Sequence, residues 1–121
     1  MISPPPAQLV RPISKLFKAL GDETRLAIVA LLTHGELCVC HITRGLGLTQ
    51  PNASRQLGIL RAAGIVEPRR ERSWVYYRLA FPPDARCDRQ LRDLVAGFAR
   101  DRRLARDVSR LVKAVGPAAC R

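Results

Sequence analysis

The fold is decided by HITRGLGLTQPNASRQLGILRAAG, which occupies residues 41–64. A short helix over 41–46 is predicted to end at Gly47, because glycine is common just beyond a helix C-terminus. Thr49 then follows as an N-cap, with Pro51 in the first turn, where its missing N–H costs little. Apolar residues recur at helical spacing over the rest of the segment. Two helices joined by a glycine-containing turn of a few residues predict a helix-turn-helix.

Upstream of this segment, the spacing of apolar residues predicts two more helices. The first covers residues 9–20 and ends at Gly21, and Asp22 is placed to cap the second, which runs to His34. Three successive prolines precede the first helix, and proline lacks the N–H donor that a helix interior needs. Residues 1–8 are therefore expected to form a flexible, proline-rich arm.

Downstream, two stretches rich in β-branched and aromatic residues, at 65–68 and 74–79, flank an arginine-rich segment. This pattern predicts a β-hairpin with a polar tip, which forms a wing beside the helix-turn-helix. Helical spacing returns over 85–115, with an interruption at 101–103 where a break can occur. A continuous helix of about thirty residues would be about 45 Å long, more than a domain of this size can bury alone.

The predicted fold class is mainly α with a small β-hairpin: a winged helix-turn-helix domain over residues 9–115, followed by a tail over 116–121. The apolar stripes of the first and last helices would otherwise stay exposed, so we expect a homodimer formed through these two helices. The expected dimer residues are Leu9, Ile13, Leu16, Leu91, Leu94, Val95, Phe98, Val108 and Leu111.

The composition limits the classes of function. The chain has 121 residues, with 21 Lys and Arg against 10 Asp and Glu, so its formal net charge is +11. This length supports one domain, and 47% hydrophobic residues are too many for a disordered polycation. A basic folded domain favours an anionic partner, and nucleic acid is favoured over a membrane surface.

The sequence shows no apolar run long enough to span a membrane and no signal peptide. We therefore expect the chain in the cytoplasm, where thiols stay reduced. It also shows no Ser/His/Asp set, no glycine-rich phosphate loop and no carboxylate pair that indicates catalysis. We expect that the chain is not an enzyme and takes no small organic substrate and no organic cofactor.

The second helix of the helix-turn-helix begins with short hydrogen-bonding side chains and one arginine, as do helices that enter a major groove. Arginines on the hairpin tip are placed to contact flanking phosphates. The residues expected to contact double-stranded DNA are Thr49, Gln50, Asn52, Ser54, Arg55 and Gln56 on the helix and Arg69, Arg70 and Arg72 on the hairpin. A nucleoid-like protein with weak base discrimination is the alternative within this class.

A second pattern, Cys38-Val39-Cys40, lies just before the helix-turn-helix. Side chains two residues apart point to the same side in extended chain, but diverge by about 200° in a helix. The two sulfurs can therefore bind one soft ion only if this junction is extended or unwinds. The alternative is that both cysteines are small buried core residues. Cys87 and Cys120 are each either a third sulfur ligand or an incidental thiol.

Five strings of the sequence carry a family resemblance. The chain contains FKALGDETRL at 17–26, ELCVC at 36–40, LTQPNASRQL at 48–57, LRAAGIV at 60–66 and WVYYRL at 74–79. Over about residues 13–80 these strings resemble the ArsR family of metalloregulatory repressors, and ELCVC is typical of its arsenic-sensing branch. The resemblance implies a homodimeric winged helix that represses an arsenic-resistance operon and leaves its operator when As(III) or Sb(III) binds.

In that branch a third cysteine commonly follows ELCVC by three residues, and this chain has Thr43 there. The resemblance therefore carries Cys38 and Cys40 over as ligands and leaves the third open. Either Cys87 or Cys120 completes a three-sulfur site, or a two-coordinate site takes a methylated or aryl arsenical whose third bond is to carbon. The resemblance excludes the zinc-sensing branch, because the last helix here has no histidine. The alternative function is a thiol-redox or persulfide sensor of the same family, in which the cysteines oxidise.

Overall fold

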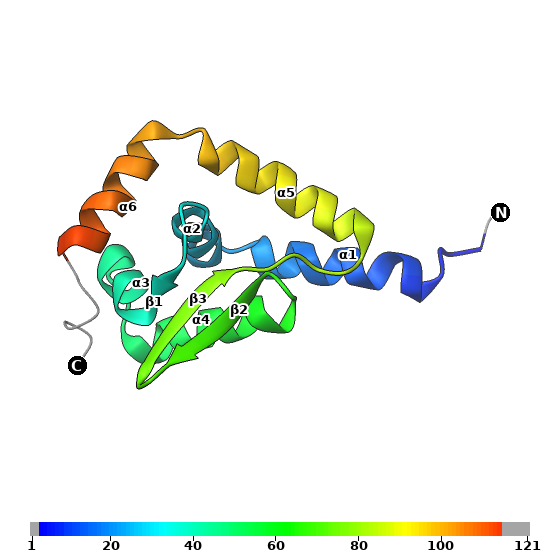
Figure 1. Cartoon of the computed structure of the whole chain (residues 1–121). Helices are drawn as coiled ribbons and strands as arrows, with labels where there is room; N and C mark the ends of the chain where they lie inside the picture. The colour runs from blue at the N-terminus through cyan, green and yellow to red at the C-terminus, as the bar shows by residue number, and fades with distance from the viewer. Residues whose placement is uncertain (1–2, 115–121) are drawn as a thin grey trace.

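The computed structural model describes residues 3–114 of the chain. Its elements are α1 (Ala7–Leu20), α2 (Glu23–Leu32), β1 (Leu37–Cys38), α3 (Val39–Leu46), α4 (Gln50–Ala62), β2 (Val66–Glu71), β3 (Trp74–Leu79), α5 (Ala85–Ala99) and α6 (Arg102–Ala114). Figure 1 shows α5 above α1 and α2, with α4 and the β2–β3 hairpin at the bottom of the view. No described helix is long and apolar enough to cross a membrane.

The first two helices begin and end close to the predicted residues. Asp22 caps α2, since its Oδ2 accepts a hydrogen bond from the backbone N–H of Arg25 at 3.1 Å. Helix α1 starts at Ala7, so two residues of the predicted arm are helical. Pro12 lies inside α1 near its exposed N-terminal end, where solvent can replace the one hydrogen bond that proline removes.

Helices α3 and α4 form the predicted helix-turn-helix. Gly47 ends α3 with φ 64°, a left-handed conformation that glycine adopts without a steric penalty. Thr49 caps α4, because its hydroxyl oxygen accepts a hydrogen bond from the backbone N–H of Asn52 at 3.2 Å. The cap and the glycine together fix where α4 starts, and therefore which residues its first turns present.

The three strands form an antiparallel sheet in the order β1-β3-β2. Tyr76 on the central strand β3 pairs with Cys38 on β1 and with Arg69 on β2. Strand β3 has its predicted bounds, whereas β2 runs on to Glu71, so the hairpin tip is shorter than predicted. Arg72 in this tip has φ 56°, as tight hairpin turns require. The sheet thus joins the first cysteine directly to the wing.

The core lies where α2, α3, α4 and α5 meet. Ile28, Ile42, Leu57, Leu60 and Leu91, which come from these four helices, are each 0% exposed. Burial of such apolar side chains is the dominant favourable term in folding. The helix-turn-helix is therefore held mainly by its packing on α2, on which α5 also packs.

The C-terminal helical region breaks at the predicted interruption, between α5 and α6. Helix α6 turns back and packs on α3. A Cβ atom on Gly45 would lie 2.8 Å from Leu111 Cδ2, so the end of the Leu111 side chain packs against the backbone of α3 at this glycine. Val108, on the same helix as Leu111, is buried. Val108 therefore packs within the protomer, which corrects its assignment to a dimer surface, whereas Leu111 is partly exposed and its place in the dimer stays a proposal.

Leu16 and Leu91 also pack inside the protomer and are 1% and 0% exposed, so they too leave the predicted dimer set. Of the rest, Leu9 is exposed, and Ile13, Leu94, Val95 and Phe98 are partly buried against the core. Exposed Val10 and Phe17 on α1 were not predicted as dimer residues. Dimerisation through α1 and α5 stays a proposal, and the predicted tail lies outside the described residues.

Candidate nucleic-acid interface and thiol pocket

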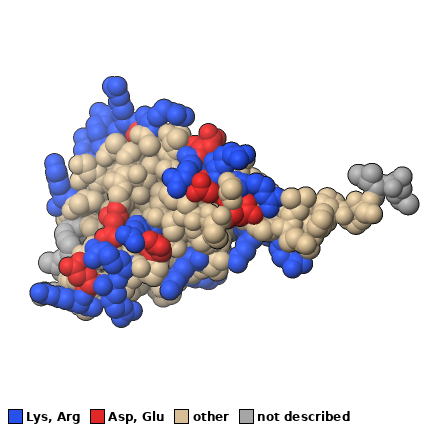
Figure 2. Space-filling model, turned by 45° about the vertical axis from the view of Figure 1, so that its right-hand side comes forward, with Lys and Arg blue, Asp and Glu red and all other residues tan. Residues whose placement is uncertain are grey.

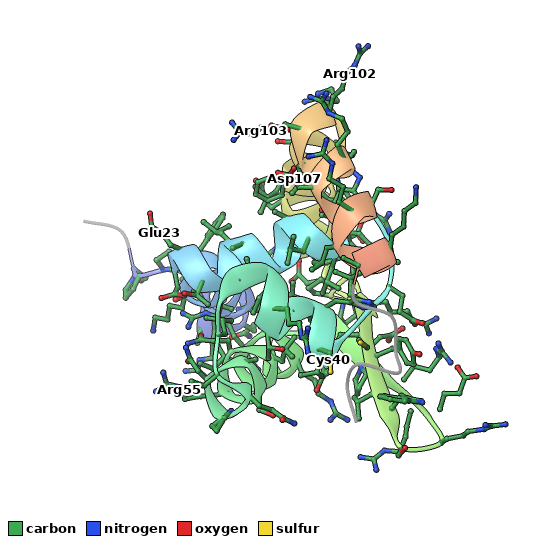
Figure 3. The ribbon with its side chains drawn as sticks, turned by 90° about the vertical axis from the view of Figure 1, so that its left-hand side faces the viewer. Glu23, Cys40, Arg55, Arg102, Arg103 and Asp107 are labelled. Atoms are coloured by element: carbon green, nitrogen blue, oxygen red, sulfur yellow. The ribbon has the colours of Figure 1, made fainter. Side chains whose placement is uncertain are left out.

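Helix α4 packs one side on the core and presents the other to solvent. Arg55 Nη2 donates a hydrogen bond to Asn52 Oδ1 at 3.1 Å, so the two side chains lie together on the first turns. In Figure 3, Arg55 lies at the opposite end of the molecule from Arg102 and Arg103 of α6. The predicted contacts that are exposed here are Thr49, Gln50, Ser54 and Arg55. These groups match the hydrogen-bonding edges of bases and phosphates.

Gln56 differs from the other predicted DNA contacts because it is only 7% exposed. Its Oε1 accepts a hydrogen bond from Arg25 Nη1 at 2.9 Å, and its Nε2 donates one to Asn52 Oδ1 at 3.1 Å. Arg25 also donates to the carbonyls of Ala19, at 2.6 Å, and Lys18, at 3.2 Å. Gln56 therefore joins α4 to α1 and α2, and we reassign it from base contact to positioning.

Loss of this junction should destabilise the fold. Arg25→Lys keeps the charge but removes the planar fork that reaches three acceptors, so we expect the free energy of unfolding to fall by about 1–3 kcal/mol. Gln56→Leu should act through the same hydrogen bond, with a coupling energy of about 0.5–3 kcal/mol in a double-mutant cycle followed by urea denaturation. Arg61→Lys on the exposed side of α4 is the control and should change stability by less than about 0.5 kcal/mol. Strictly additive losses would contradict the assignment.

Lys and Arg side chains lie in several groups over the visible surface (Figure 2). The arginines of the wing differ in what they contact. Arg69 Nε donates to both carboxylate oxygens of Glu36 at 3.1 Å, and its guanidinium lies 4.7 Å from the ring centroid of Tyr76. The hydrogen bond from Arg69 lowers the pKa of Glu36. Arg70 and Arg72 are exposed, and neither has an ion-pair partner among residues 3–114. These two are the predicted wing residues that are available to phosphates.

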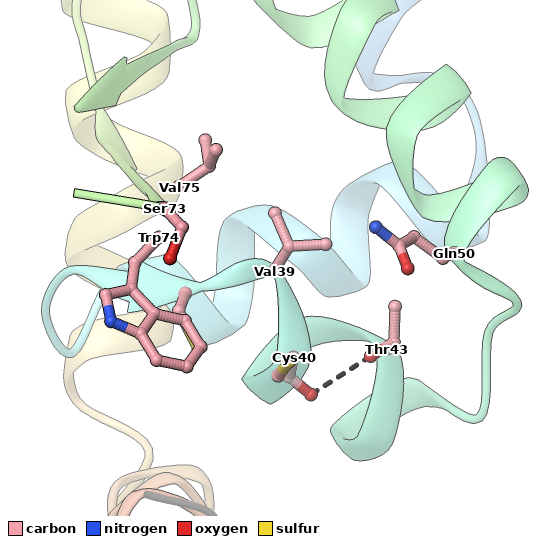
Figure 4. A pocket seen from close by; sticks show the side chains of 8 residues that line it. Val39, Cys40, Thr43, Gln50, Ser73, Trp74 and Val75 are labelled. Carbon is pink, nitrogen blue, oxygen red and sulfur yellow. Dashed lines mark hydrogen bonds between the residues drawn. The ribbon is translucent and has the colours of Figure 1, made fainter. Parts of the chain in front are cut away.

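A pocket of about 130 Å³ lies where the start of α3, the start of α4 and the wing meet. Figure 4 shows Cys40, Thr43, Gln50 and Trp74 around this space. The residues that line it are Cys38, Val39, Cys40, Thr43, Gln50, Ser73, Trp74 and Val75. One pocket therefore touches the cysteine pair and both elements that are predicted to contact DNA.

Cys38 and Cys40 lie where extended chain becomes helix. Cys38 is buried, has extended backbone angles, and is the N-cap of α3. Its backbone N–H donates a hydrogen bond to His41 Nδ1 at 3.1 Å, and with this cap α3 begins two residues earlier than predicted. Cys40 lies in the first turn of α3, half-buried. Its sulfur is in a disulfide bond, so it can bind a soft ion only after reduction to the thiol.

Two cysteines line the pocket. Thr43, which stands where the arsenic-sensing branch commonly has a third cysteine, also lines it and supplies no sulfur. The Thr43 hydroxyl donates a hydrogen bond to the Cys40 carbonyl at 3.0 Å. Cys87 does not line the pocket; it is 2% exposed, and burial raises the pKa of its thiol. Cys120 lies outside the described residues. Within residues 3–114, no cluster of three or more His, Cys, Asp and Glu side chains is arranged to hold a metal ion.

Comparison with known proteins agrees with this architecture. A family model described as "Bacterial regulatory protein, arsR family" matches residues 22–68. The chain is also 48% identical over 65 residues to an uncharacterized HTH-type transcriptional regulator of Methanocaldococcus jannaschii. The aligned residues cover 53% of this chain and 73% of that protein. The chain belongs to the arsR family. This family consists of regulatory proteins, in agreement with the prediction that the chain is not an enzyme.

Two further arsR-family relatives bear on function and assembly. The arsenical resistance operon repressor of Escherichia coli is 51% identical over 67 residues, which is 54% of this chain and 57% of that protein. This chain thus spans little more than half of that relative's length. The homodimeric winged helix-turn-helix DNA-binding domain from Mycobacterium bovis, a possible ArsR-family transcriptional regulator, superposes with a TM-score of 0.62 at 32% identity. That comparison covers 82% of this chain and 84% of that one, and it confirms the predicted fold.

Proposed function

We propose that the chain is a cytoplasmic, homodimeric transcriptional repressor of an arsenic-resistance operon. In this proposal it leaves its double-stranded operator when a trivalent arsenical or antimonite binds Cys38 and Cys40. The observation that carries it is the shared pocket, whose lining includes both cysteines, the first residue of α4 and three residues of the wing. The similarity to a relative named arsenical resistance operon repressor supports the choice of inducer.

In the repressing form, α4 of each protomer enters a major groove. A two-fold dimer places the two recognition helices about 34 Å apart, on successive grooves of one face of the duplex. Arg55 is suited to guanine, because its guanidinium can form two hydrogen bonds with the edge of that base. Exposed Arg70 and Arg72 reach flanking phosphates.

Release follows from the geometry of the cysteine junction. Cys38 has extended backbone angles and Cys40 lies in the first turn of α3, so both line one pocket, and closing the two sulfurs on one arsenic atom is expected to unwind this first turn. Unwinding breaks the hydrogen bond between Cys38 and His41 and moves α3, which packs directly on α4. An allosteric coupling of about 1–3 kcal/mol would lower operator affinity about 5- to 150-fold.

The pocket favours an arsenical that carries an organic group. Two cysteines supply two of the three bonds that trivalent arsenic forms. The Thr43 hydroxyl already donates a hydrogen bond to the Cys40 carbonyl. Val39, Trp74 and Val75 supply apolar lining, and the volume of about 130 Å³ exceeds what a bare ion occupies. A methyl or phenyl group bonded to arsenic fits this space. Sulfur from Cys120 is the competing third ligand, and Cys87 is disfavoured because it lies in the core.

The proposal is tested with the wild-type chain under reducing conditions. Duplexes selected from a random-sequence library should converge on a two-fold symmetric site, bound at least about 10³-fold more tightly than random duplex at fixed salt. Fluorescence anisotropy should then show a fall in affinity of about 5- to 150-fold on addition of phenylarsine oxide, arsenite or antimonite. Equal affinity for selected and random duplex would instead indicate a nucleoid-like protein and contradict the proposal.

X-ray absorption at the arsenic edge distinguishes the two ligand sets. With phenylarsine oxide, two sulfurs and one carbon are expected around arsenic in the wild type, in Cys87→Ser and in Cys120→Ser. With arsenite, three sulfurs in the wild type and two in Cys120→Ser would assign the third ligand to Cys120. No arsenic–sulfur bond in any of them would rule out the cysteine site.

A further inference from the structure

A groove of about 530 Å³ runs between α1 and the C-terminal half of α4. We propose that this α1–α4 groove contacts the phosphate backbone of DNA between the two recognition helices. The inference rests on the proposed function, because it assumes that α4 docks on a duplex. It extends the contact surface to a helix that the sequence assigned only to dimerisation.

The rim of the groove is positively charged. Arg11, Lys15 and Lys18 line it and are spaced i, i+4 and i+7, so their side chains share one face of α1. All three are exposed, and none has an ion-pair partner within the described part of the chain. The described residues that line the groove include no Asp or Glu. Figure 2 shows Lys and Arg along the lower edge of the molecule, beneath the projecting N-terminal segment.

The fourth cation of the groove, Arg25, has a different role. Its guanidinium donates to two carbonyls at the end of α1 and to Gln56 of α4. These hydrogen bonds hold the two walls of the groove at a fixed separation. The positive charge that is available to a ligand in this groove therefore comes from Arg11, Lys15 and Lys18 on α1.

The floor of the groove continues the exposed face of α4. Ile59 and Ala62 follow Arg55 at i+4 and i+7, so they lie on the same side of the helix, and Ile59 is 39% exposed. The aliphatic stems of lysine can cover such an apolar floor while their ammonium groups stay in water or reach an anion. A duplex that contacts Arg55 would therefore also lie beside the α1–α4 groove.

DNA is favoured over a second copy of the chain as the occupant. In a two-fold interface the same patch lies on both subunits, so a copy seated over this groove would bring like charges together. B-DNA carries one negative charge per about 1.7 Å of axis, which complements a row of three cations. If α1 also forms the dimer, the groove lies near the two-fold axis, beside the central phosphates of the operator.

The test removes two charges per protomer by Lys15→Gln with Lys18→Gln. The control removes the same charge by Arg102→Gln with Arg103→Gln on α6, at the opposite end from Arg55 (Figure 3). Affinity for the selected duplex and for random duplex is measured by anisotropy over a range of salt. We expect the slope of log K against log salt to become shallower by about 0.9 for each phosphate that is no longer neutralised, hence by about 3.6 for four phosphates in a dimer. The control should keep the wild-type slope, and Lys15→Arg with Lys18→Arg should also keep it.

An unchanged slope in the glutamine variant would overturn the proposal, and so would a change in slope equal to that of the control. A glutamine variant that sediments as a monomer, where the wild type is a dimer, would overturn it as well, because the groove would then be a subunit contact. In all these cases the proposed function stands if the wild type still prefers its selected duplex. Failure of the wild type to prefer any duplex would count against the proposed function itself.

Discussion

Simultaneous replacement of Cys38 and Cys40 by serine should leave operator affinity unchanged and remove release by arsenicals. The wild-type response is expected to be about 5- to 150-fold, and the variant response about 1-fold. The physical reason is that both sulfurs line the pocket beside α4, while neither lies on the exposed face of α4 that carries Arg55. A mobility shift or anisotropy titration with phenylarsine oxide and arsenite, in reducing buffer, measures the effect.

Two controls keep this result interpretable. Cys87→Ser should release normally, because Cys87 does not line the pocket. Cys38 is 1% exposed, so a serine hydroxyl there can destabilise the fold, and Cys38→Ala with Cys40→Ala tests the same point without a buried polar atom. Normal arsenite release by both double variants would show that the inducer binds elsewhere.

Leu57→Ala should lower the free energy of unfolding by about 2–5 kcal/mol, which reduces the folding equilibrium constant by roughly 30- to 5000-fold. Leu57 is 0% exposed and lies on the core side of α4, so its truncation removes apolar contacts and leaves a cavity. Urea denaturation followed by circular dichroism measures the loss. DNA binding should weaken as well, because the same cavity lies beneath the recognition helix.

Ile59→Ala on the same helix is the matched control. Its side chain is 39% exposed, so its truncation should cost much less than that of Leu57. Equal losses in the two variants would mean that the faces of α4 are assigned incorrectly.

The elements with strong local signals could be predicted from the sequence. Strand β3 has its predicted bounds, and Asp22 and Thr49 cap the helices they were expected to cap. A cap is a contact between residues three apart, and strand alternation is read within a few residues. Such features need no knowledge of the rest of the chain.

Features that depend on distant residues could not be predicted. Gln56 looks like a base contact by its position on α4, and only Arg25, 31 residues away, shows that it is buried and bonded. Arg69 lies on the arginine-rich hairpin and was expected to contact DNA, but its guanidinium is ion-paired with Glu36, 33 residues away. Helix α6 returns onto α3 and Leu111 packs against Gly45, a contact between distant residues that no periodicity reveals.

The candidate site was predicted in part. The cysteine pair could be found from its spacing, but the other side of its pocket comes from Ser73, Trp74 and Val75 on the wing. No local pattern links the wing to the cysteines; the pairing of β1 with β3 brings them together. The wing therefore lines the candidate site, which the sequence does not show.

The burial of Cys38 has a consequence for how fast a repressor of this design responds. Only 1% of the residue is exposed, whereas Cys40, once reduced, lies nearer the surface. If the proposed ligand binds these cysteines, we expect the first bond to form at Cys40 and the second to wait until the protein opens around Cys38. At high ligand concentration we then expect the rate of the second step to become independent of dose and to equal the opening rate of the first turn of α3.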